Sequence, residues 1–490
     1  MKQLKVLFIA SELTPLAKVG GLADVIGALP IALEKLGVDV RIAIPRYGTI
    51  DSTKYPLTKV ADNVPVPFNG ATARMGIWRT PLPGSNVPVY LLENQDYLSQ
   101  GGIYFSDDAS SQGSVSEAHR FLFLSRACLE LFGPAGWYPD IIHCHDWHVG
   151  MVPVLLKVLA AKDRRLAAMK SMLTIHNLEY QGWYPADLVY RSLNLNQQSY
   201  PTLTHQSGDS LSTLQQAILS SDLLTTVSPS YAQEILTPEY GAKLEPLLQR
   251  RRDQLFGILN GIDTSRFNPE TDKATAAQFS TTALDGKRQC KAALQKLCGL
   301  PEKSGSPLIG LVSRLATQKG LDLVTAAAGH LAQSGAQLIL LGTGEPAIEQ
   351  EVRVMLAKYP QAVYGKIAFD ARFAQAIYAG ADMFLMPSRF EPCGLGQMIA
   401  MRYGTVPIVR ATGGLRDTVH DYTADPATGD GFSFTEYRRA ALTDAVKRAV
   451  ALYAQPELWY TVVKRIMQKD FSWSVSAQQY RALYTSLTRT

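Results

Sequence analysis

The sequence predicts an α/β protein built from two doubly wound domains, each with a parallel sheet. Short apolar runs typical of buried strands alternate with segments in which apolar residues recur at helical spacing. This alternation occurs in both halves of the 490-residue chain, and several of the runs end at glycine or polar residues. A composition of 46% hydrophobic and 19% charged residues is normal for a globular protein and allows a large core.

The first half opens with a predicted βαβ unit. Residues 5–10 and 38–44 have strand patterns. Between them Pro30 is expected to kink a helix, and Gly37 to end it. That helix is predicted from the apolar residues Leu22, Val25, Ile26, Leu29, Leu33 and Leu36. A βαβ order implies a parallel sheet. Further strands are expected at 140–144, 172–175 and 223–227.

The second half repeats this scheme. Strands are expected at 308–312, 337–341, 383–386 and 406–409. Helices are expected at 321–331 and 394–401, and a further one opens at Gly413-Gly414. Residues 264–306 hold few strand signals and are assigned to the entry of the second domain. The joint is expected near 246–258, which gives domains of 1–255 and 256–470.

The charge distribution argues against a nucleic-acid partner. The net charge is only +5 and the basic residues are scattered. The densest run, Arg250 to Arg252, is short and lies beside Asp253. A solvated helix end explains this run better than a nucleic-acid patch does.

The cysteines and the apolar runs favour a cytoplasmic enzyme. The N-terminal apolar run is short and broken by Lys5, so it reads as a strand rather than a signal peptide. No stretch approaches the roughly 18 apolar residues that span a bilayer. An odd, dispersed set of cysteines without a C-x-x-C pair argues against disulfides and structural zinc and favours a reducing compartment. The set is Cys128, Cys144, Cys290, Cys298 and Cys393.

A glycine pair lies between the first predicted strand and helix. In residues 18–24 the glycines let backbone N–H groups approach an anion, and the helix N-terminus adds about half a positive charge. Lys18 adds a full charge. The spacing is not G-x-G-x-x-G, so no dinucleotide fingerprint is present. A tight turn that needs glycine for conformation alone is an equally good interpretation.

Two motifs follow strands of the second half. Arg314 and Lys319 could converge on a phosphate pair, since the arginine fork binds bidentately and lysine supplies a point charge. Alternatively, they are solvated cations at a helix start. In residues 388–396, Glu391 could accept hydrogen bonds from sugar hydroxyls, or it could be a helix-terminus charge. Cys393 is better explained as a small buried residue than as a nucleophile.

Two histidine motifs follow strands of the first half. Residues 143–148, H-C-H-D-W-H, resemble a metal cluster, but ligands one or two apart do not converge easily, so a metal is the weaker interpretation. Aromatic and polar side chains at a sheet edge also suit sugar binding. His176 ends another strand, where a lone histidine is more often structural than catalytic.

Together these motifs resemble the bacterial glycogen synthase and plant starch synthase family. The resemblance covers essentially the whole chain, and the ordered combination is highly specific although each motif alone is weak. The motifs are K-x-G-G-L-A-D-V near 20, H-x-H-D-W-H near 145, T-x-H-N-L-x-Y-Q-G near 176, V-S-P near 228, L-N-G-I-D at 259–263, S-R-L-x-x-Q-K-G-L-D near 314, S-R-F-E-P-C-G-L at 388–395, T-G-G-L at 412–415 and D-F-S-W at 470–473.

The resemblance implies a fold, a reaction and a set of site residues. It implies two Rossmann-like domains (the GT-B fold), an active site in the cleft between them, and a last segment, 471–490, that crosses back to the first domain. It implies transfer of glucose from ADP-glucose to the non-reducing end of an α-1,4-glucan, with no cofactor or metal. The catalytic residues would be Arg314 and Lys319, which stabilise the leaving diphosphate, Glu391, which binds glucose hydroxyls, and His176, which lines the glucose site.

The remaining roles are also implied by the resemblance. Lys18 and Gly21 would contact the diphosphate, with Asp24 supporting that loop. Further contacts to the donor would come from Asn177, Asn260, Phe369, Leu395 and Gly396. The acceptor side would contain Tyr104, Asp146 and Trp147.

The chain departs from the family pattern at four positions. Val19 and Gly396 stand where threonine is common, and Gly396 is expected to loosen phosphate contacts. Ile399 replaces the second glutamate of an E-x7-E pattern, so Glu391 lacks that partner. Phe369 replaces a tyrosine and can still stack on adenine.

The expected mechanism is front-face displacement with retention, assisted by the leaving phosphate, because few nucleophile candidates are present. The alternatives on the same fold are a UDP-glucose-dependent, sucrose-forming or phosphorylase-like transferase. A catalytically silent glucan-binding protein is an alternative of another class.

Overall fold

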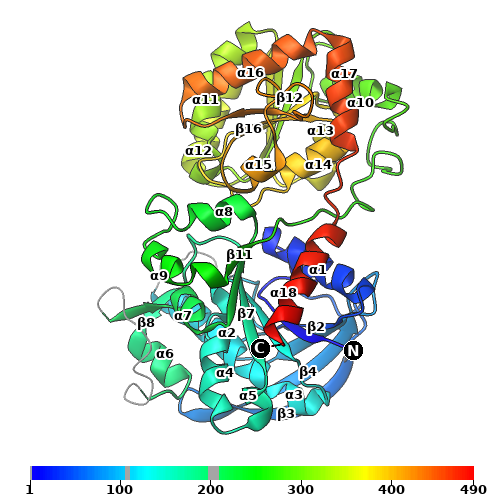
Figure 1. Cartoon of the computed structure of the whole chain (residues 1–490). Helices are drawn as coiled ribbons and strands as arrows, with labels where there is room; N and C mark the ends of the chain where they lie inside the picture. Colours follow the sequence, from blue (N-terminus) through cyan, green and yellow to red (C-terminus); the bar gives the residue numbers. More distant parts are fainter. Residues whose placement is uncertain (1–2, 105–110, 197–208, 490) are drawn as a thin grey trace. The chain divides into compact units, whose positions relative to one another are not determined.

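The computed structural model describes residues 3–104, 111–196 and 209–489 (Figure 1). The chain divides into two compact units. Unit 1 contains residues 1–227, 232–261 and 473–490, and unit 2 contains 228–231 and 262–472. The sequence placed the corresponding ends at 255 and 470.

Unit 1 is built on a nine-stranded sheet in the order β11-β10-β7-β6-β1-β2-β5-β4-β3. The strands from β11 to β5 pair in parallel, whereas β4 pairs antiparallel with β5 and β3. Their bounds are β1 Lys5–Ile9, β2 Asp39–Pro45, β3 Thr58–Phe68, β4 Ala71–Pro81, β5 Pro88–Glu93, β6 Ile141–His145, β7 Lys170–Ile175, β10 Leu223–Thr226 and β11 Leu255–Gly257.

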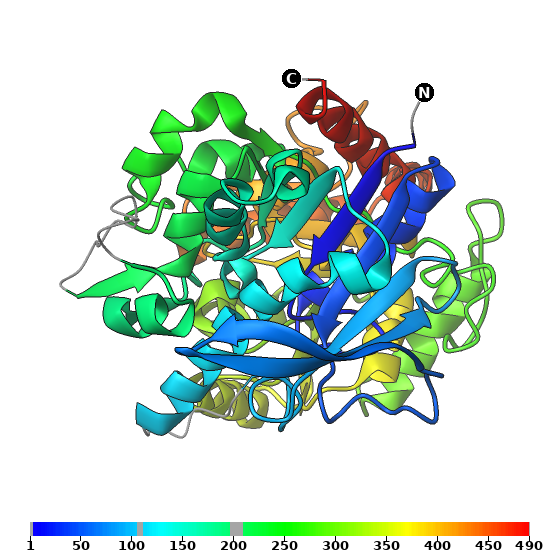
Figure 2. The same cartoon turned by 90° about the horizontal axis from the view of Figure 1, so that it is seen from below.

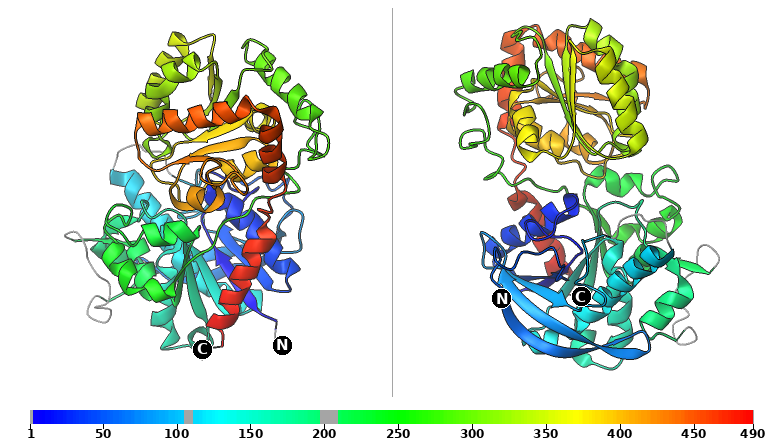
Figure 3. Two further views of the ribbon diagram at one scale, coloured as in Figure 1. Left: turned by 45° about the horizontal axis from the view of Figure 1, so that its top comes forward. Right: turned by 180° about the vertical axis from the view of Figure 1, so that it is seen from behind.

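The antiparallel strands β3 and β4 were not predicted from the sequence. Figure 2 and the right panel of Figure 3 show them as long strands at one margin of the sheet. Pro65 and Pro67 interrupt the strand signal of β3, because proline cannot donate to a ladder. They are tolerated there because β3 is the edge strand and pairs on one side only.

Helix α1 (Gly21–Lys35) follows β1 as expected, with Pro30 inside it. Helix α18 (Trp473–Leu487) belongs to unit 1 and packs beside α1 (Figure 1 and Figure 3, left). Buried residues of both helices share one hydrophobic core. The other elements are α2 Ser111–Ala127, α3 Phe132–Ala135, α4 Val152–Ala160, α5 Arg164–Ala167, β8 Trp183–Pro185, α6 Ala186–Ser192, β9 Ser210–Ser212, α7 Thr213–Ser220, α8 Pro229–Glu234 and α9 Glu245–Arg250.

The arginine run at 250–252 is only partly the solvated helix end that the sequence suggested. Arg250 and Arg252 are exposed, but Arg251 is half-buried. Its guanidinium donates to the carbonyls of Ile218, 2.5 Å away, and Ser221, 2.7 Å away. Arg251 therefore caps the C-terminus of α7, where a cation also meets the negative end of the helix dipole.

Unit 2 contains a six-stranded parallel sheet in the order β14-β13-β12-β15-β16-β17. Numbered along the chain this is 3-2-1-4-5-6, the order of dinucleotide-binding folds, with its switch point between β12 and β15. The doubly wound fold class is therefore confirmed. Sequence reasoning missed two strands, β14, which contains Gly365 and Lys366, and β17, which has three residues.

Helices cover both faces of this sheet (Figure 1). The strands are β12 Leu308–Val312, β13 Gln337–Gly342, β14 Val363–Ile367, β15 Met383–Met386, β16 Val406–Arg410 and β17 Phe432–Phe434. The helices are α10 Asp285–Leu297, α11 Leu321–Gln333, α12 Pro346–Lys358, α13 Ala371–Gly380, α14 Gly396–Arg402, α15 Gly413–Thr418, α16 Arg439–Tyr453 and α17 Pro456–Met467. No helix in the described ranges is both long and apolar enough to cross a bilayer.

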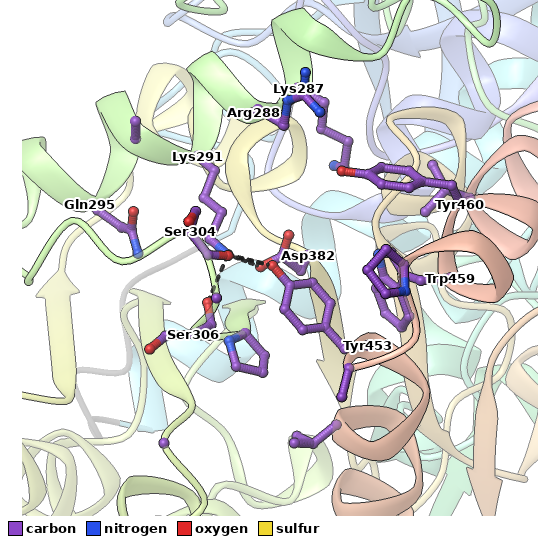
Figure 4. A pocket seen from close by; sticks show the side chains of 18 of the residues that line it. Lys287, Arg288, Lys291, Gln295, Ser304, Ser306, Asp382, Tyr453, Trp459 and Tyr460 are labelled. Carbon is purple, nitrogen blue, oxygen red and sulfur yellow. Dashed lines mark hydrogen bonds and ion pairs between the residues drawn. The ribbon is translucent and has the colours of Figure 1, made fainter.

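A cavity of about 740 Å³ lies at the amino end of the unit 2 sheet, lined by α10, α16 and α17 (Figure 4). The Lys291 Nζ on α10 lies 2.7 Å from Asp382 Oδ2 and donates to the Ser304 and Ser306 carbonyls and the Tyr453 hydroxyl. This ammonium is saturated by the protein's own acceptors, so it fastens α10 to the strand starts rather than presenting a free charge to a ligand.

Replacing Lys291 with methionine should lower the melting temperature of unit 2 strongly. Both partners are buried, and removing one leaves the Asp382 carboxylate without a counterion, at a cost of about 3–5 kcal/mol. Arg288→Met is the matched control on the same helix, because Arg288 forms an exposed ion pair with Asp285. Circular dichroism melts measure both, and equal melting temperatures would contradict the assignment.

Candidate active site

In unit 2 the predicted motifs meet at the carboxyl edge of the sheet. Residues 313–320 follow β12, 387–396 follow β15, and 411–415 follow β16. These three strands are neighbours, so their carboxyl ends lie side by side. Ligands of open α/β sheets bind at this edge, next to the switch point between β12 and β15.

The first two loops are held together by Gln318. The Gln318 carbonyl accepts from Arg389 N at 2.8 Å, and its side-chain amide donates to the Phe390 carbonyl at 3.2 Å. Gly320 has φ of +71°, and a Cβ there would lie 2.2 Å from the Pro387 carbonyl oxygen. The loops therefore approach each other so closely that only glycine fits at position 320.

Lys319 and Glu391 form the ion pair at the centre of this edge. The Lys319 Nζ lies 2.9 and 2.7 Å from the two carboxylate oxygens of Glu391. Ser388 Oγ donates to the same carboxylate at 2.9 Å. Glu391 is buried and Lys319 is largely so. The two predicted catalytic residues thus form one preorganised pair, with the hydroxyl of Ser388 as a third member.

The third loop packs on the backbone of Glu391. Gly414 N donates to the Glu391 carbonyl at 3.1 Å, and a Cβ at Gly413 would lie 2.0 Å from the same oxygen. These contacts hold the main chain of Glu391, whereas Lys319 and Ser388 hold its side chain. The T-G-G-L motif therefore acts as a support for Glu391.

Arg314 and Phe369 are both exposed at this edge of the sheet. The Arg314 guanidinium is 3.4 Å from Gln318 Oε1, a long contact that leaves most of its donors to solvent. The Phe369 ring, which follows β14, is 86% exposed. Both side chains are open to a ligand.

Leu395 and Gly396 begin α14, behind the ion pair. A Cβ at Gly396 would lie 2.9 Å from the Phe384 ring on β15. The space that a threonine side chain would need is therefore occupied by Phe384, which gives a packing reason for this departure from the family pattern. Ile399, the other departure on α14, is buried.

In unit 1 the loop before α1 is organised by Glu12, a residue that sequence reasoning missed. The buried Glu12 carboxylate accepts from Val19 N at 2.8 Å, Gly20 N at 2.6 Å and the Tyr104 hydroxyl at 2.7 Å. Glu12 lies just beyond the carboxyl end of β1, and this position in the sequence could have marked it as a candidate site residue. The carboxylate thus occupies the Gly20 N–H, a backbone group of the glycine pair for which an anion site and a tight turn were equally good interpretations.

The charges of the same loop are matched within the unit. Lys18 Nζ lies 2.6 Å from Asp24 Oδ1, which also accepts from Thr14 Oγ1 at 3.3 Å. Asp24 thus joins the side chains of Lys18 and Thr14 within this loop. Gly21 is exposed, and a Cβ there would have no neighbour within 4 Å, so its backbone is open to approach.

The ends of β6 and β7 are joined by Asp146. The buried carboxylate accepts from His176 N at 2.7 Å, and Asp146 has φ of +60°. Burial raises the pKa of Asp146 to about 7. The residue that the resemblance placed on the acceptor side thus also fixes the backbone of His176.

His176 itself is half-buried, and burial lowers its pKa to about 3, so its ring is neutral at physiological pH. Its Nε2 lies 3.0 Å from His145 Nδ1. The neighbouring Asn177 closes a local turn, because its Oδ1 accepts from Glu179 N at 3.1 Å. Within the described ranges, no three His, Cys, Asp or Glu side chains are placed to hold a metal ion, the 143–148 motif included.

The remaining predicted residues of unit 1 are two aromatic residues, Trp147 and Tyr104, and Asn260. The Trp147 indole stacks on His148 at 4.0 Å, and the Tyr104 ring lies 5.5 Å from the same imidazole. Asn260 is buried, and its Oδ1 accepts from no described residue. Among the described residues, no contact joins Asn260 to His143, His145, His148 or His176. None joins Phe369 to the Lys319–Glu391 pair.

Comparison with known families matches both units. Residues 5–250 match the starch synthase catalytic domain, and residues 306–451 match the glycosyl transferases group 1. A glycogen synthase of Geobacillus thermodenitrificans is 43% identical over 488 residues, which is 99% of this chain and 98% of the relative. The chain belongs to the glycogen and starch synthase family of glycosyltransferases.

Further relatives agree with this family. Glycogen synthase 2 of Geobacter sulfurreducens is 43% identical over 98% of both chains. The catalytic domain of starch synthase IV from Arabidopsis thaliana, solved with ADP and acarbose, superposes with a TM-score of 0.91 at 37% identity over the full length of both chains. A sucrose-phosphate synthase of Thermosynechococcus elongatus, 18% identical over 99% of this chain and 100% of its own, has a TM-score of 0.61 and shares the fold.

The buried Asp146 carboxyl predicts a pH-dependent stability. Because its pKa in the folded protein, about 7, lies above the ordinary aspartate value of 3.8, the native state keeps a proton that the unfolded state has lost. This group therefore stabilises the fold less as the pH rises from about 4 to 7. In Asp146→Asn the melting temperature relative to the parent should rise between pH 5 and pH 8.

Differential scanning fluorimetry at several pH values measures this difference. Asp187→Asn is the control, because Asp187 forms an exposed ion pair with Arg191 and should shift the melting temperature little at any pH. A melting difference for Asp146→Asn that stays flat across this range would show that the carboxyl is not buried as described.

Proposed function

We propose that this chain transfers glucose from ADP-glucose to the non-reducing end of an α-1,4-glucan with retention of configuration. The observation that carries the proposal is the Lys319–Glu391 pair beside Arg314 at the switch point of the unit 2 sheet. It combines cations for a departing diphosphate with a fixed carboxylate for sugar hydroxyls. The ADP and acarbose bound to the starch synthase of Arabidopsis support the same substrate classes.

The physical demands of glycosyl transfer agree with these groups. The diphosphate gains negative charge as the glycosidic bond breaks, so cations fixed beside it lower the barrier. Arg314 supplies a planar fork and Lys319 a point charge, and Lys18 remains a predicted ligand of a diphosphate. These cations take the role that a divalent metal has in other transferases, so the reaction should need none.

Glu391 acts here as a ligand of glucose hydroxyls rather than as a nucleophile. Its two oxygens already accept from Lys319 and Ser388, so the carboxylate is held in place and its charge is neutralised. With Glu391 held in this way, the acceptor hydroxyl adds to the anomeric carbon on the face from which the diphosphate departs, and its proton passes to the departing diphosphate. Configuration is then retained in one step, without a covalent glucosyl-enzyme.

The aromatic residues of unit 1 suit the glucan. Trp147 is half-buried beside Tyr104 and His148, and an indole face packs well against a pyranose. The purine of the donor is assigned to the exposed ring of Phe369, since a phenyl face stacks on any base. Asn260, with its unpaired amide oxygen, is assigned to the sugar.

The function is tested with a panel of donors and glycogen as acceptor. ADP-glucose should give glucan elongation and ADP release, with a specificity constant several-fold or more above that for UDP-glucose, and EDTA should leave the rate unchanged. Equal or better use of UDP-glucose would overturn the donor assignment, and product formed on fructose phosphates would indicate a sucrose-forming enzyme. Glucan binding without any diphosphate release would indicate a silent binding protein.

Arg314→Ala should lower kcat rather than only raise KM. A cation beside the leaving group binds the transition state more strongly than the bound donor, and loss of one such contact costs about 3 kcal/mol, roughly a hundredfold in rate. Arg314→Lys should restore this only in part, because a point charge cannot replace the fork. Arg288→Ala, exposed at the amino end of the same sheet, should have normal kinetics.

Lys319→Ala should show the same kinetic loss together with reduced stability. It leaves the buried Glu391 carboxylate without its cation, so melting must be compared before the rates are interpreted. Affinity for glycogen should stay nearly unchanged. Near-normal kcat in both Arg314→Ala and a folded Lys319→Ala would place the reaction elsewhere.

A further inference from the structure

Four histidines gather at the ends of β6 and β7 in unit 1: His143, His145, His148 and His176. The His145 ring has no exposed surface. It stacks on Phe8 at 5.0 Å and lies 4.1 Å from the His143 ring, so it cannot rotate freely. In this fixed orientation its Nδ1 lies 3.0 Å from Nε2 of His176.

Both rings of the pair carry a single proton near neutral pH. Burial holds the pKa of His145 well below its usual value and lowers that of His176 to about 3. In a hydrogen bond between two neutral imidazoles, one nitrogen donates and the other accepts. The pair therefore has two possible arrangements, which differ in the tautomer of both rings.

The other nitrogen of His145 distinguishes these arrangements. His145 Nε2 is buried and has no hydrogen-bond partner in the described part of the chain. If Nε2 carried the proton, a buried N–H would be left without an acceptor, which is rarer and more costly than an unpaired acceptor. The proton of His145 therefore belongs on Nδ1, where it is donated to His176 Nε2.

We infer that His145 is a positioning residue that fixes His176 in the Nδ1–H tautomer, so that His176 presents a hydrogen-bond donor to the glucose. The inference rests on the proposed function for the place of His176 at the sugar. A hydroxyl oxygen of the hexose accepts from Nδ1–H, while Nε2 is occupied by His145. His176 therefore orients the sugar and takes no proton from it.

The backbone of His176 is fixed independently. Its backbone N–H donates to Asp146 Oδ1 at 2.7 Å, so His145 holds the ring and Asp146 holds the main chain of His176. Replacing His145 should therefore change the tautomer and the ring orientation of His176 while leaving its main chain in place.

The tautomer is measured by NMR on the full-length protein with ¹⁵N-labelled histidine, with His176 assigned from a His176→Gln sample. In the parent, the His176 Nδ1 should carry the proton. His145→Asn keeps an N–H donor near the position of Nδ1 and should preserve this tautomer. His145→Leu removes the donor and should allow the Nε2–H tautomer. His330→Asn is the control, since His330 is exposed on α11 of unit 2, and it should leave His176 unchanged.

The kinetic arm uses the same variants with ADP-glucose and glycogen. His145→Leu should lower kcat by about tenfold or more, as loss of a partner that orients a site ligand commonly does. His145→Asn should stay within about threefold of the parent, because the donor is retained. Melting curves of all variants show whether the fold is kept.

Two results would overturn the inference: a His176 Nε2–H tautomer in the parent, or equal kcat in His145→Leu and His145→Asn. Failure of the proposed function has a different signature. A parent that releases no diphosphate from any donor would remove the place of the sugar, while the tautomer measurement would still decide whether His145 controls His176.

Discussion

The pairing of β12 with both β13 and β15 is the constraint on which the candidate site of unit 2 depends. Because the chain leaves β12 for β13 on one side and returns through β15 on the other, the loops after β12 and β15 are forced together. That proximity gives Lys319 its partner in Glu391 across 72 residues of sequence. The close backbone approach at Gly320 and the hydrogen bond of Gln318 to the Phe390 carbonyl then hold the two loops together.

The two units differ in the charge state of the side chains at their strand ends. In unit 2 the candidate site residues are one ion pair and one largely exposed arginine, and Lys291 is fastened at the opposite edge of the sheet. In unit 1 the polar groups at the strand ends are mostly neutral at working pH, because burial lowers the pKa values of the histidines and raises that of Asp146. Unit 1 therefore offers directional hydrogen bonds, and unit 2 offers net charge.

Much of this arrangement could be predicted from the sequence. The βαβ alternation predicted most of the parallel strands, because strands buried on both faces are uniformly apolar. It missed β3 and β4, whose prolines and exposed face weaken the signal, and the parallel strands β5, β11, β14 and β17. Arg314, Lys319 and Glu391 were singled out because their motifs follow predicted strands, and the roles given to them came from the family resemblance.

The partners of these residues could not be predicted in the same way. The bond of His145 to His176 and those of Glu12 to the loop at 19–20 depend on side-chain directions at neighbouring strand ends, which spacing does not specify. Glu12 in particular stands in an ordinary polar turn, and only the fold shows that its carboxylate is buried.

The Glu12 carboxylate has a consequence for how the loop before α1 selects ligands. Because it is part of the same chain, this carboxylate stays beside the N–H groups of Val19 and Gly20, and a free anion must displace it to bind them. Small anions such as phosphate therefore compete poorly for those two groups. The exposed backbone of Gly21 is left open to a ligand, whereas the Lys18 ammonium is shared with Asp24, so recognition there is by shape as well as charge.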